Sequence, residues 1–269
     1  MYRRLTLFVG VLLIATGADA RWFASAEFAE PDSRPHKLAL LPPHAEMMKQ
    51  KMVMTEQLVQ EAQRLEAITT DAMAAHLRDR GYEVVVIDQN AVNADPELQE
   101  LVLKANSRYE EEWARIVRKP KRVRYGYYSV GDEARILAAA LDVDGLIFTR
   151  IVATGAGGGQ KALRMLIGGF ATFTRLDASI VDGDDGAVEA FYFAQTETGY
   201  AEITKKAQKT MSKLTVKTLK KYPDIDAKLK VKVPTQEEIA AIEEEDDDKL
   251  MDELEALLEE ESSPEDTDS

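Results

Sequence analysis

Three short apolar runs, each separated from the next by helix-like sequence, constrain the fold of this chain most strongly. The runs cover residues 37–41, 83–88 and 143–153 and read "KLALL", "EVVVID" and "VDGLIFTRIVA". Over residues 45–80 the apolar positions recur at i, i+3 and i+4 steps, which predicts one long helix. Strands that alternate with helices pair in parallel, so the first half of the chain predicts an α/β fold.

Prolines and glycines set the boundaries of these elements. Pro42 and Pro43 follow the first run and end that strand, because proline cannot donate to a sheet ladder. Gly81 ends the long helix, and Asp95–Pro96 supplies a cap for the next one. The second run is apolar throughout, which predicts a strand that is buried on both faces.

The second half of the chain predicts antiparallel strands. Two apolar segments within residues 174–197 flank the turn "DGDDG" at 182–186, which is a strong hairpin signal. An amphipathic helix with apolar residues on one face and lysines on the other follows within residues 201–223. We therefore expect a single three-layer α/β sandwich over residues 37–223, with parallel strands, an antiparallel hairpin and flanking helices.

The N-terminal residues indicate export. Residues 1–20 combine "MYRR", an apolar stretch and the small-residue motif "ADA", which is the pattern of a cleaved signal peptide. The alternative is an uncleaved anchor, although the apolar stretch is shorter than a spanning helix needs. We expect the mature chain to have no transmembrane segment, to lie in the periplasm with or without contact with the outer membrane, and to begin with an irregular lead-in, residues 21–36.

The net charge of −14 belongs to one end of the chain. The acidic tail, residues 236–269, carries seventeen acidic residues against Lys249, a charge of −16, which leaves 33 basic and 31 acidic residues elsewhere. Blocks of like charge repel, so the C-terminal residues 224–269, which end in this acidic tail, are predicted to be mostly disordered. A near-neutral body argues against nucleic-acid binding.

The glycine cluster after the third run, "GAGGGQK", has the outline of a phosphate-binding loop. Such a loop requires a second glycine five residues after the first and a hydroxyl directly after the lysine. Counted from Gly155, these positions hold Gln160 and Ala162, and only Lys161 is in register. The cluster is therefore interpreted as a connection between strands rather than a nucleotide site.

Catalytic and metal motifs are not evident either. The chain has no cysteine, and His36, His44 and His76 lack metal-ligand spacing. The acidic turn 182–186 resembles a calcium loop, but it lacks that motif's later ligands, so a hairpin turn or a weak surface cation site remains. We expect no enzymatic activity and no cofactor.

A basic, tyrosine-rich loop is the first candidate binding surface. Interleaved arginine and tyrosine can bind an anionic polymer, a lipid head group, a small ligand, a protein or the acidic tail of the same chain. The eight residues in question are Arg118, Lys119, Lys121, Arg122, Arg124, Tyr125, Tyr127 and Tyr128.

Several segments together resemble a known family. They are "KLALLPP", "HLRDRGYEVVVID", "ILAAALDVDGLIFTRI", "LDASIVDGDDGAVEAFYF" and the closing "KKYP". This pattern resembles the periplasmic α/β domain shared by the TolB N-terminal domain, the curli-secretion CsgG family and several envelope lipoproteins. Two features depart from it, because the chain lacks a cysteine to carry a lipid and the acidic tail lies outside the family pattern.

The resemblance implies a non-enzymatic protein that binds other proteins in cell-envelope assembly or secretion, with a homo-oligomer left open. It also directs attention to the glycine-flanked insertion, residues 155–170, as a second candidate interaction element. Its candidate contact residues are Leu163, Met165, Leu166, Ile167 and Phe170.

Overall fold

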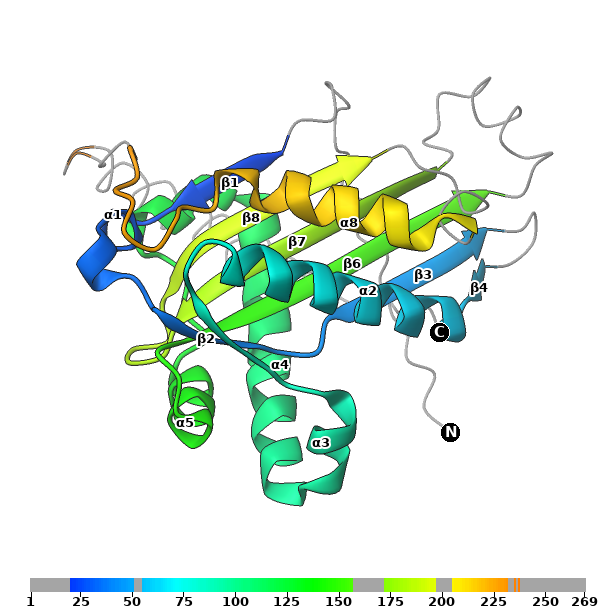
Figure 1. Ribbon diagram of the computed structural model, residues 1–269, viewed down its shortest axis with the longest axis horizontal. Helices are drawn as coiled ribbons and strands as arrows, with labels where there is room; N and C mark the ends of the chain where they lie inside the picture. Colours follow the sequence, from blue (N-terminus) through cyan, green and yellow to red (C-terminus); the bar gives the residue numbers. More distant parts are fainter. Residues whose placement is uncertain are drawn as a thin grey trace, which may run out of the picture.

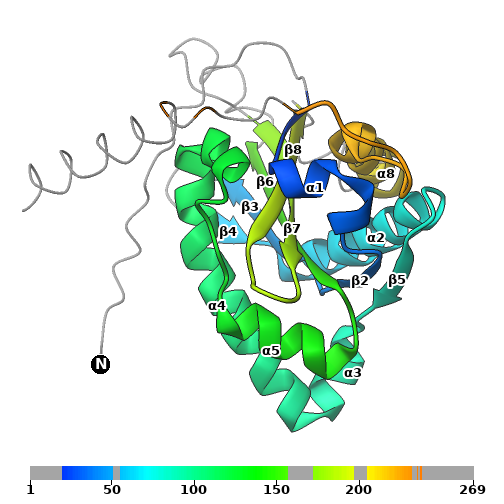
Figure 2. The same ribbon diagram turned by 90° about the vertical axis from the view of Figure 1, so that its left-hand side faces the viewer.

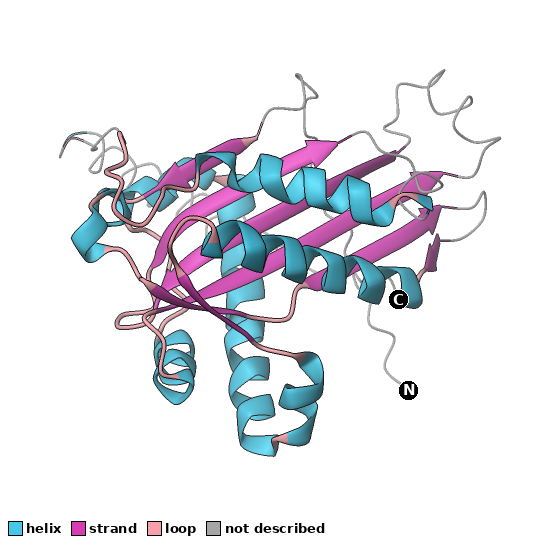
Figure 3. Ribbon diagram, viewed as in Figure 1, coloured by secondary structure: helices cyan, strands magenta, loops and turns pink. Residues whose placement is uncertain are grey.

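The computed structural model describes residues 20–50, 55–156, 172–196 and 205–231, together with residues 235 and 237. In these residues eight strands form one mixed sheet, and helices cover both of its faces (Figures 1, 2 and 3). The predicted three-layer α/β sandwich with parallel strands and an antiparallel hairpin is therefore confirmed.

The main path of the sheet runs through six strands. In spatial order they are β1 (Arg21–Ala24), β8 (Val188–Thr196), β7 (Thr172–Asp182), β6 (Gly145–Ala156), β2 (Lys37–Leu40) and β5 (Glu83–Val86). Strand β2 is parallel to both β5 and β6, whereas β6, β7, β8 and β1 pair in antiparallel fashion. The predicted hairpin around residues 182–186 joins β7 to β8.

Two further strands correct the sequence prediction of one long helix over residues 45–80. Strands β3 (His44–Gln50) and β4 (Thr55–Gln57) pair with each other, and helix α2 (Val59–Arg78) begins only after them. Strand β6 is longer than β2. After the break at Pro42–Pro43, β3 pairs in parallel with the part of β6 that β2 does not reach. The hydrogen bonds that β6 offers thus outweigh the local helical spacing.

The helices divide into two layers, which Figure 2 separates clearly. Helices α1 (Ala26–Ala29), α2 and α8 (Ala207–Thr218), with the 3₁₀ turns η1 (Pro31–Ser33) and η3 (Leu219–Lys221), lie on one face. The other layer contains α4 (Pro96–Arg118), η2 (Pro120–Tyr125) and α5 (Asp132–Leu141), and α3 (Gln89–Ala94) packs beside α4.

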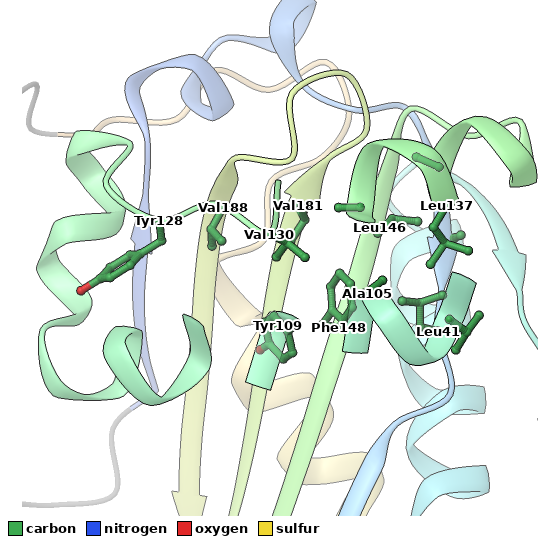
Figure 4. Close-up of a cluster of buried hydrophobic side chains, with 14 of the residues drawn as sticks. Leu41, Ala105, Tyr109, Tyr128, Val130, Leu137, Leu146, Phe148, Val181 and Val188 are labelled. Atoms are coloured by element: carbon green, nitrogen blue, oxygen red, sulfur yellow. The ribbon is translucent and has the colours of Figure 1, made fainter. Parts of the chain in front are cut away.

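Each layer buries its own apolar core against the sheet. Under α4 and α5, Tyr109 stacks on Phe148 with ring centroids 4.4 Å apart, and Leu137 and Val181 close the same cluster (Figure 4). Under α2 and α8 the core is aliphatic over most of its length and ends in a group of tyrosines around Tyr222.

Residues 21–36 are not the irregular lead-in that the sequence predicts. Residues 21–24 form β1, which adds an edge strand to β8, and Phe28 of the short helix α1 is fully buried. The prediction of a second strand buried on both faces is also wrong. Strand β5 lies beyond β2 on the path of the described sheet, and Val86 is 38% exposed.

Candidate binding surfaces

The basic loop 118–128 is packed against the body of the protein rather than spread over its surface. Arg122 and Tyr128 are buried, with 7% and 2% of their surface exposed. The guanidinium of Arg122 lies 4.9 Å from the ring centroid of Tyr127, and the hydroxyl of Tyr128 donates to the carbonyl of Lys119 at 2.9 Å. The loop is thereby fixed to the end of α4.

The remaining residues of the predicted site differ in exposure. Arg118 and Lys121 are exposed, whereas Lys119, Arg124, Tyr125 and Tyr127 are half-buried. Arg124 lies over the ring of Phe23 at 5.4 Å and so ties the loop to β1. The loop is thus also a structural connection between α4 and the sheet edge, and its role in binding stays a prediction.

The second candidate element, the glycine-flanked insertion, lies outside the described residues. This applies to all five of its predicted contact residues, which are Leu163, Met165, Leu166, Ile167 and Phe170. Their contribution to binding stays a prediction as well.

The most basic surface element is α8. Residues 205–221 contain seven lysines and no acidic residue. The helix forms because Ala207, Met211 and Leu214 recur at helical spacing and are buried between the sheet and α2. The lysines consequently occupy the outer face, as the sequence predicts, and Figure 1 shows α8 in front of the sheet beside α2.

A groove runs between this outer face and the end of β8. It has a volume of about 270 Å³ and is lined by Thr196, Lys206, Lys209, Thr210, Lys213, Leu214 and Lys217. None of its four lysines forms an ion pair with a carboxylate in the part of the chain that the structure describes. We refer to these four lysines and Thr196 as the lysine groove.

The lysine groove is suited to an anionic ligand. Its ammonium groups are point charges on flexible stems, and they repeat every three or four residues along one helix. Sequence reasoning recognised the lysine face but did not treat it as a site. The available signal was seven lysines in seventeen residues without a compensating acid.

A charged network under α4 was not predicted. Arg150 pairs with Glu46 at 2.8 Å and lies 4.0 Å from the ring centroid of Trp113. The indole of Trp113 donates to Asp177 at 3.0 Å, and Asp177 in turn pairs with buried Arg175 at 2.6 Å. Each of these charged side chains has a partner of opposite charge, and the hydrogen bond from Trp113 to Asp177 joins α4 to β7 of the sheet.

A cavity of about 650 Å³ lies at the carboxyl ends of β2 and β5, between α2 and α3. Ligands of open α/β sheets bind at such strand ends. Its lining includes Glu66, Asp71 and Asp88 and contains no lysine or arginine, and burial raises the pKa of Glu66. The cavity is therefore a poor receptor for phosphate.

In the acidic turn 182–186, backbone amides of the turn itself already bond to the side chain of Asp182. One carboxylate oxygen of Asp182 accepts from the amide nitrogens of Asp184, at 2.7 Å, and Asp185, at 3.3 Å. Among the described residues no three histidine, aspartate or glutamate side chains lie together where they could hold a metal ion. None of the helices in the described residues is long and apolar enough to cross a bilayer.

No known protein family and no curated protein matches this sequence. Among solved structures, the PelC dodecamer from Paraburkholderia phytofirmans matches 79% of this chain and all of its own, with 11% identity and a TM-score of 0.38. Lipoprotein GNA1162 from Neisseria meningitidis matches 66% of this chain and 96% of its own, with 14% identity and a TM-score of 0.29.

Proposed function

We propose that this chain is an exported, non-enzymatic protein of the cell envelope that binds an acidic segment of a partner protein in its lysine groove. The signal-like residues 1–20 support export. Membership of the TolB-like and CsgG-like group of periplasmic domains is part of the same proposal, and it rests on the sequence segments that resemble that group.

The lysine groove is the observation that carries the proposal. Four ammonium groups converge on one groove without a carboxylate partner in the described residues, and mutual repulsion among them opposes folding. An acidic peptide laid along the helix relieves that repulsion. Because the lysines form a row rather than a ring, the groove fits an extended or helical segment better than a single small anion.

The basic loop is the weaker alternative for binding an anionic polymer, lipid head group or small ligand. Only Arg118 and Lys121 of its eight residues are exposed. Arg122 and Arg124 are already placed against aromatic rings of the protein itself.

Binding of a fluorescein-labelled oligoglutamate, followed by anisotropy, tests the proposal. So that the chain's own tail does not take part, the measurement uses a neutral-tail chain, in which all seventeen acidic residues of the acidic tail are replaced by glutamine and asparagine. The double change Lys209→Glu and Lys213→Glu is expected to weaken binding by about tenfold or more.

The matched control reverses the two exposed charges of the loop, Arg118→Glu and Lys121→Glu. This variant should bind the probe as the neutral-tail chain does. An equal loss in both variants, or no binding by the neutral-tail chain, would overturn the assignment to the lysine groove.

A further inference from the structure

We propose that the acidic run at residues 243–248 of the same chain occupies the lysine groove and screens it from partners. This inference rests on the proposed function, since the groove is taken to be the partner site. The tail would then regulate the access of partners to the lysine groove.

The charges on the two segments are complementary. Residues 243–248 read "EEEDDD", six consecutive acidic residues within a tail of net charge −16. Residues 205–221 carry seven lysines and no acid. The two segments therefore carry opposite charges of similar size, six acidic residues against seven lysines.

The tail leaves the described body on the side of the sheet where α8 lies. Val231 and Leu229 pack against the core cluster that contains Leu219 and Tyr222, just after α8. The amide of Leu229 also donates to the carbonyl of Ala29 at 3.0 Å, which fixes this exit point.

The connecting segment is long enough for the tail to reach the groove. Residues 231–243 can span up to about 40 Å when extended. Helix α8 has 12 residues and is therefore only about 18 Å long. The acidic run can thus reach every lysine of the groove while Leu229 and Val231 stay packed against the body.

Several basic side chains elsewhere in the described body are already paired with carboxylates, so they are weaker competitors for the tail than the lysines of the groove. Arg150 and Arg175 pair with buried or half-buried carboxylates, and Lys228 pairs with Glu30 at 2.5 Å. An ion pair formed by the tail at these positions would have to displace an existing partner.

Attachment to the same chain gives the tail an advantage over a free partner. A tethered segment has an effective concentration in the millimolar range, so a partner must exceed that competition to bind. The contact consists of exposed charges, and it therefore weakens as salt screens them.

Zero-length carbodiimide crosslinking of the full chain, read by peptide mass spectrometry, tests the contact directly. Carboxylates of residues 243–248 should crosslink to Lys209, Lys213 and Lys217 well above Lys121, an exposed lysine of the basic loop on the opposite face. An equal distribution over Lys121 and the groove, or no crosslink from the tail, would refute the contact.

The same reaction on a mixture of isotopically heavy and light chains shows whether the tail acts within one chain. Crosslinked peptides should be all heavy or all light. Mixed pairs at the statistical frequency would mean that the tail reaches a second copy, and the intramolecular contact would be wrong.

Oligoglutamate binding separates this inference from the proposed function. The chain with its native tail should bind the probe roughly tenfold more weakly than the neutral-tail chain at low salt. If both chains bind equally, the groove remains a binding site but the tail does not screen it. If neither binds, the proposed function itself fails.

Discussion

Glu189 is a carboxyl group that the fold buries at the edge of the sheet, where it is 6% exposed. It accepts hydrogen bonds from the hydroxyl of Ser25 and from the amide of Phe28, the latter at 3.1 Å. Burial raises its pKa to about 7, and the nearby acid Glu27 adds to that shift. The residue thus joins the segment after β1 to β8 through a group that titrates near neutrality.

We predict that stability depends on the protonation of Glu189. The fold binds this proton more tightly than the unfolded chain, whose glutamate has a pKa near 4.5. The free energy of unfolding should therefore fall as pH rises from about 4.5 to about 7, by up to about 3 kcal/mol, and this contribution should level off above that window. Urea unfolding at a series of pH values measures it.

The variant Glu189→Gln keeps acceptors for Ser25 and Phe28 but cannot ionise. Its stability should exceed that of the parent protein at pH 8 and approach it at pH 5. Curves that stay parallel over the whole range would show that Glu189 does not titrate in this window.

At the scale of elements, the turn between β7 and β8 also holds the start of α5 in place. Gly186 has a φ of +76°, and its carbonyl accepts from the amide of Val130 at 2.8 Å. A Cβ atom at this position would overlap the carbonyl oxygen of Gly131 and lie 2.7 Å from its amide nitrogen. The turn can therefore approach the neighbouring backbone only without a side chain.

Gly186→Ala should lower the free energy of unfolding by more than about 2 kcal/mol, because a backbone clash adds to the cost of a positive φ. Gly126→Ala is the matched control. Its φ is +65°, but nothing lies within 4 Å of the added Cβ, so it should cost only about 1 kcal/mol. Equal losses in chemical denaturation would show that the contact with Gly131 is unimportant.

The elements that could be predicted from the sequence are those whose boundaries are set by residues within or next to them. Helix α4 begins where Asp95–Pro96 predicts, and Asp95 caps it by accepting from the amides of Glu97 and Leu98. The prediction of helix is wrong for residues 45–50 and 55–57 because their conformation depends on a distant partner. Only the length of β6 beyond β2 reveals that a second strand is needed there.

The two candidate binding surfaces, the lysine face of α8 and the basic loop, also differ in how far local sequence predicts them. The lysine face of α8 follows from helical periodicity within one segment. The attachment of the basic loop to the body cannot be predicted from its own sequence. Arg124 is held by Phe23, a residue of β1 that lies far away in the sequence. Local composition therefore identified charge correctly but could not tell which charges the fold had already engaged.

At the scale of the whole molecule, the pairing of β1 with β8 joins the first and the last strand of the described sequence. Ala24 lies opposite Ala190, and the amide of Ser25 donates to the carbonyl of Glu189 at 2.8 Å. The alanine pair is therefore a non-hydrogen-bonded pair, whose Cα atoms lie about 4.5 Å apart in antiparallel sheets. That separation is within disulfide range.

Because the chain has no cysteine, the double variant Ala24→Cys and Ala190→Cys would contain a single possible disulfide. Oxidation should stabilise the protein by up to about 5 kcal/mol, since the bridge closes a very long loop. Thermal unfolding with and without reductant measures the gain.

The pair Ala24→Cys and Ala178→Cys provides the control. Ala178 lies on β7, opposite Tyr192 and one strand further from β1. Thiol titration should find this second pair reduced under the same oxidising conditions. A bridge there, or none between positions 24 and 190, would contradict the register of the edge strand.

This pairing also has a kinetic consequence. Strand β1 is synthesised before any other strand described here, yet it can join the sheet only after β8, the last of them, has been made. Until then the outer edge of β8 presents unpaired amide and carbonyl groups, which are a template for association between chains. Contacts between such distant segments form slowly. The interval between the emergence of β8 and the arrival of β1 is therefore the period in which a newly made chain is most prone to aggregate.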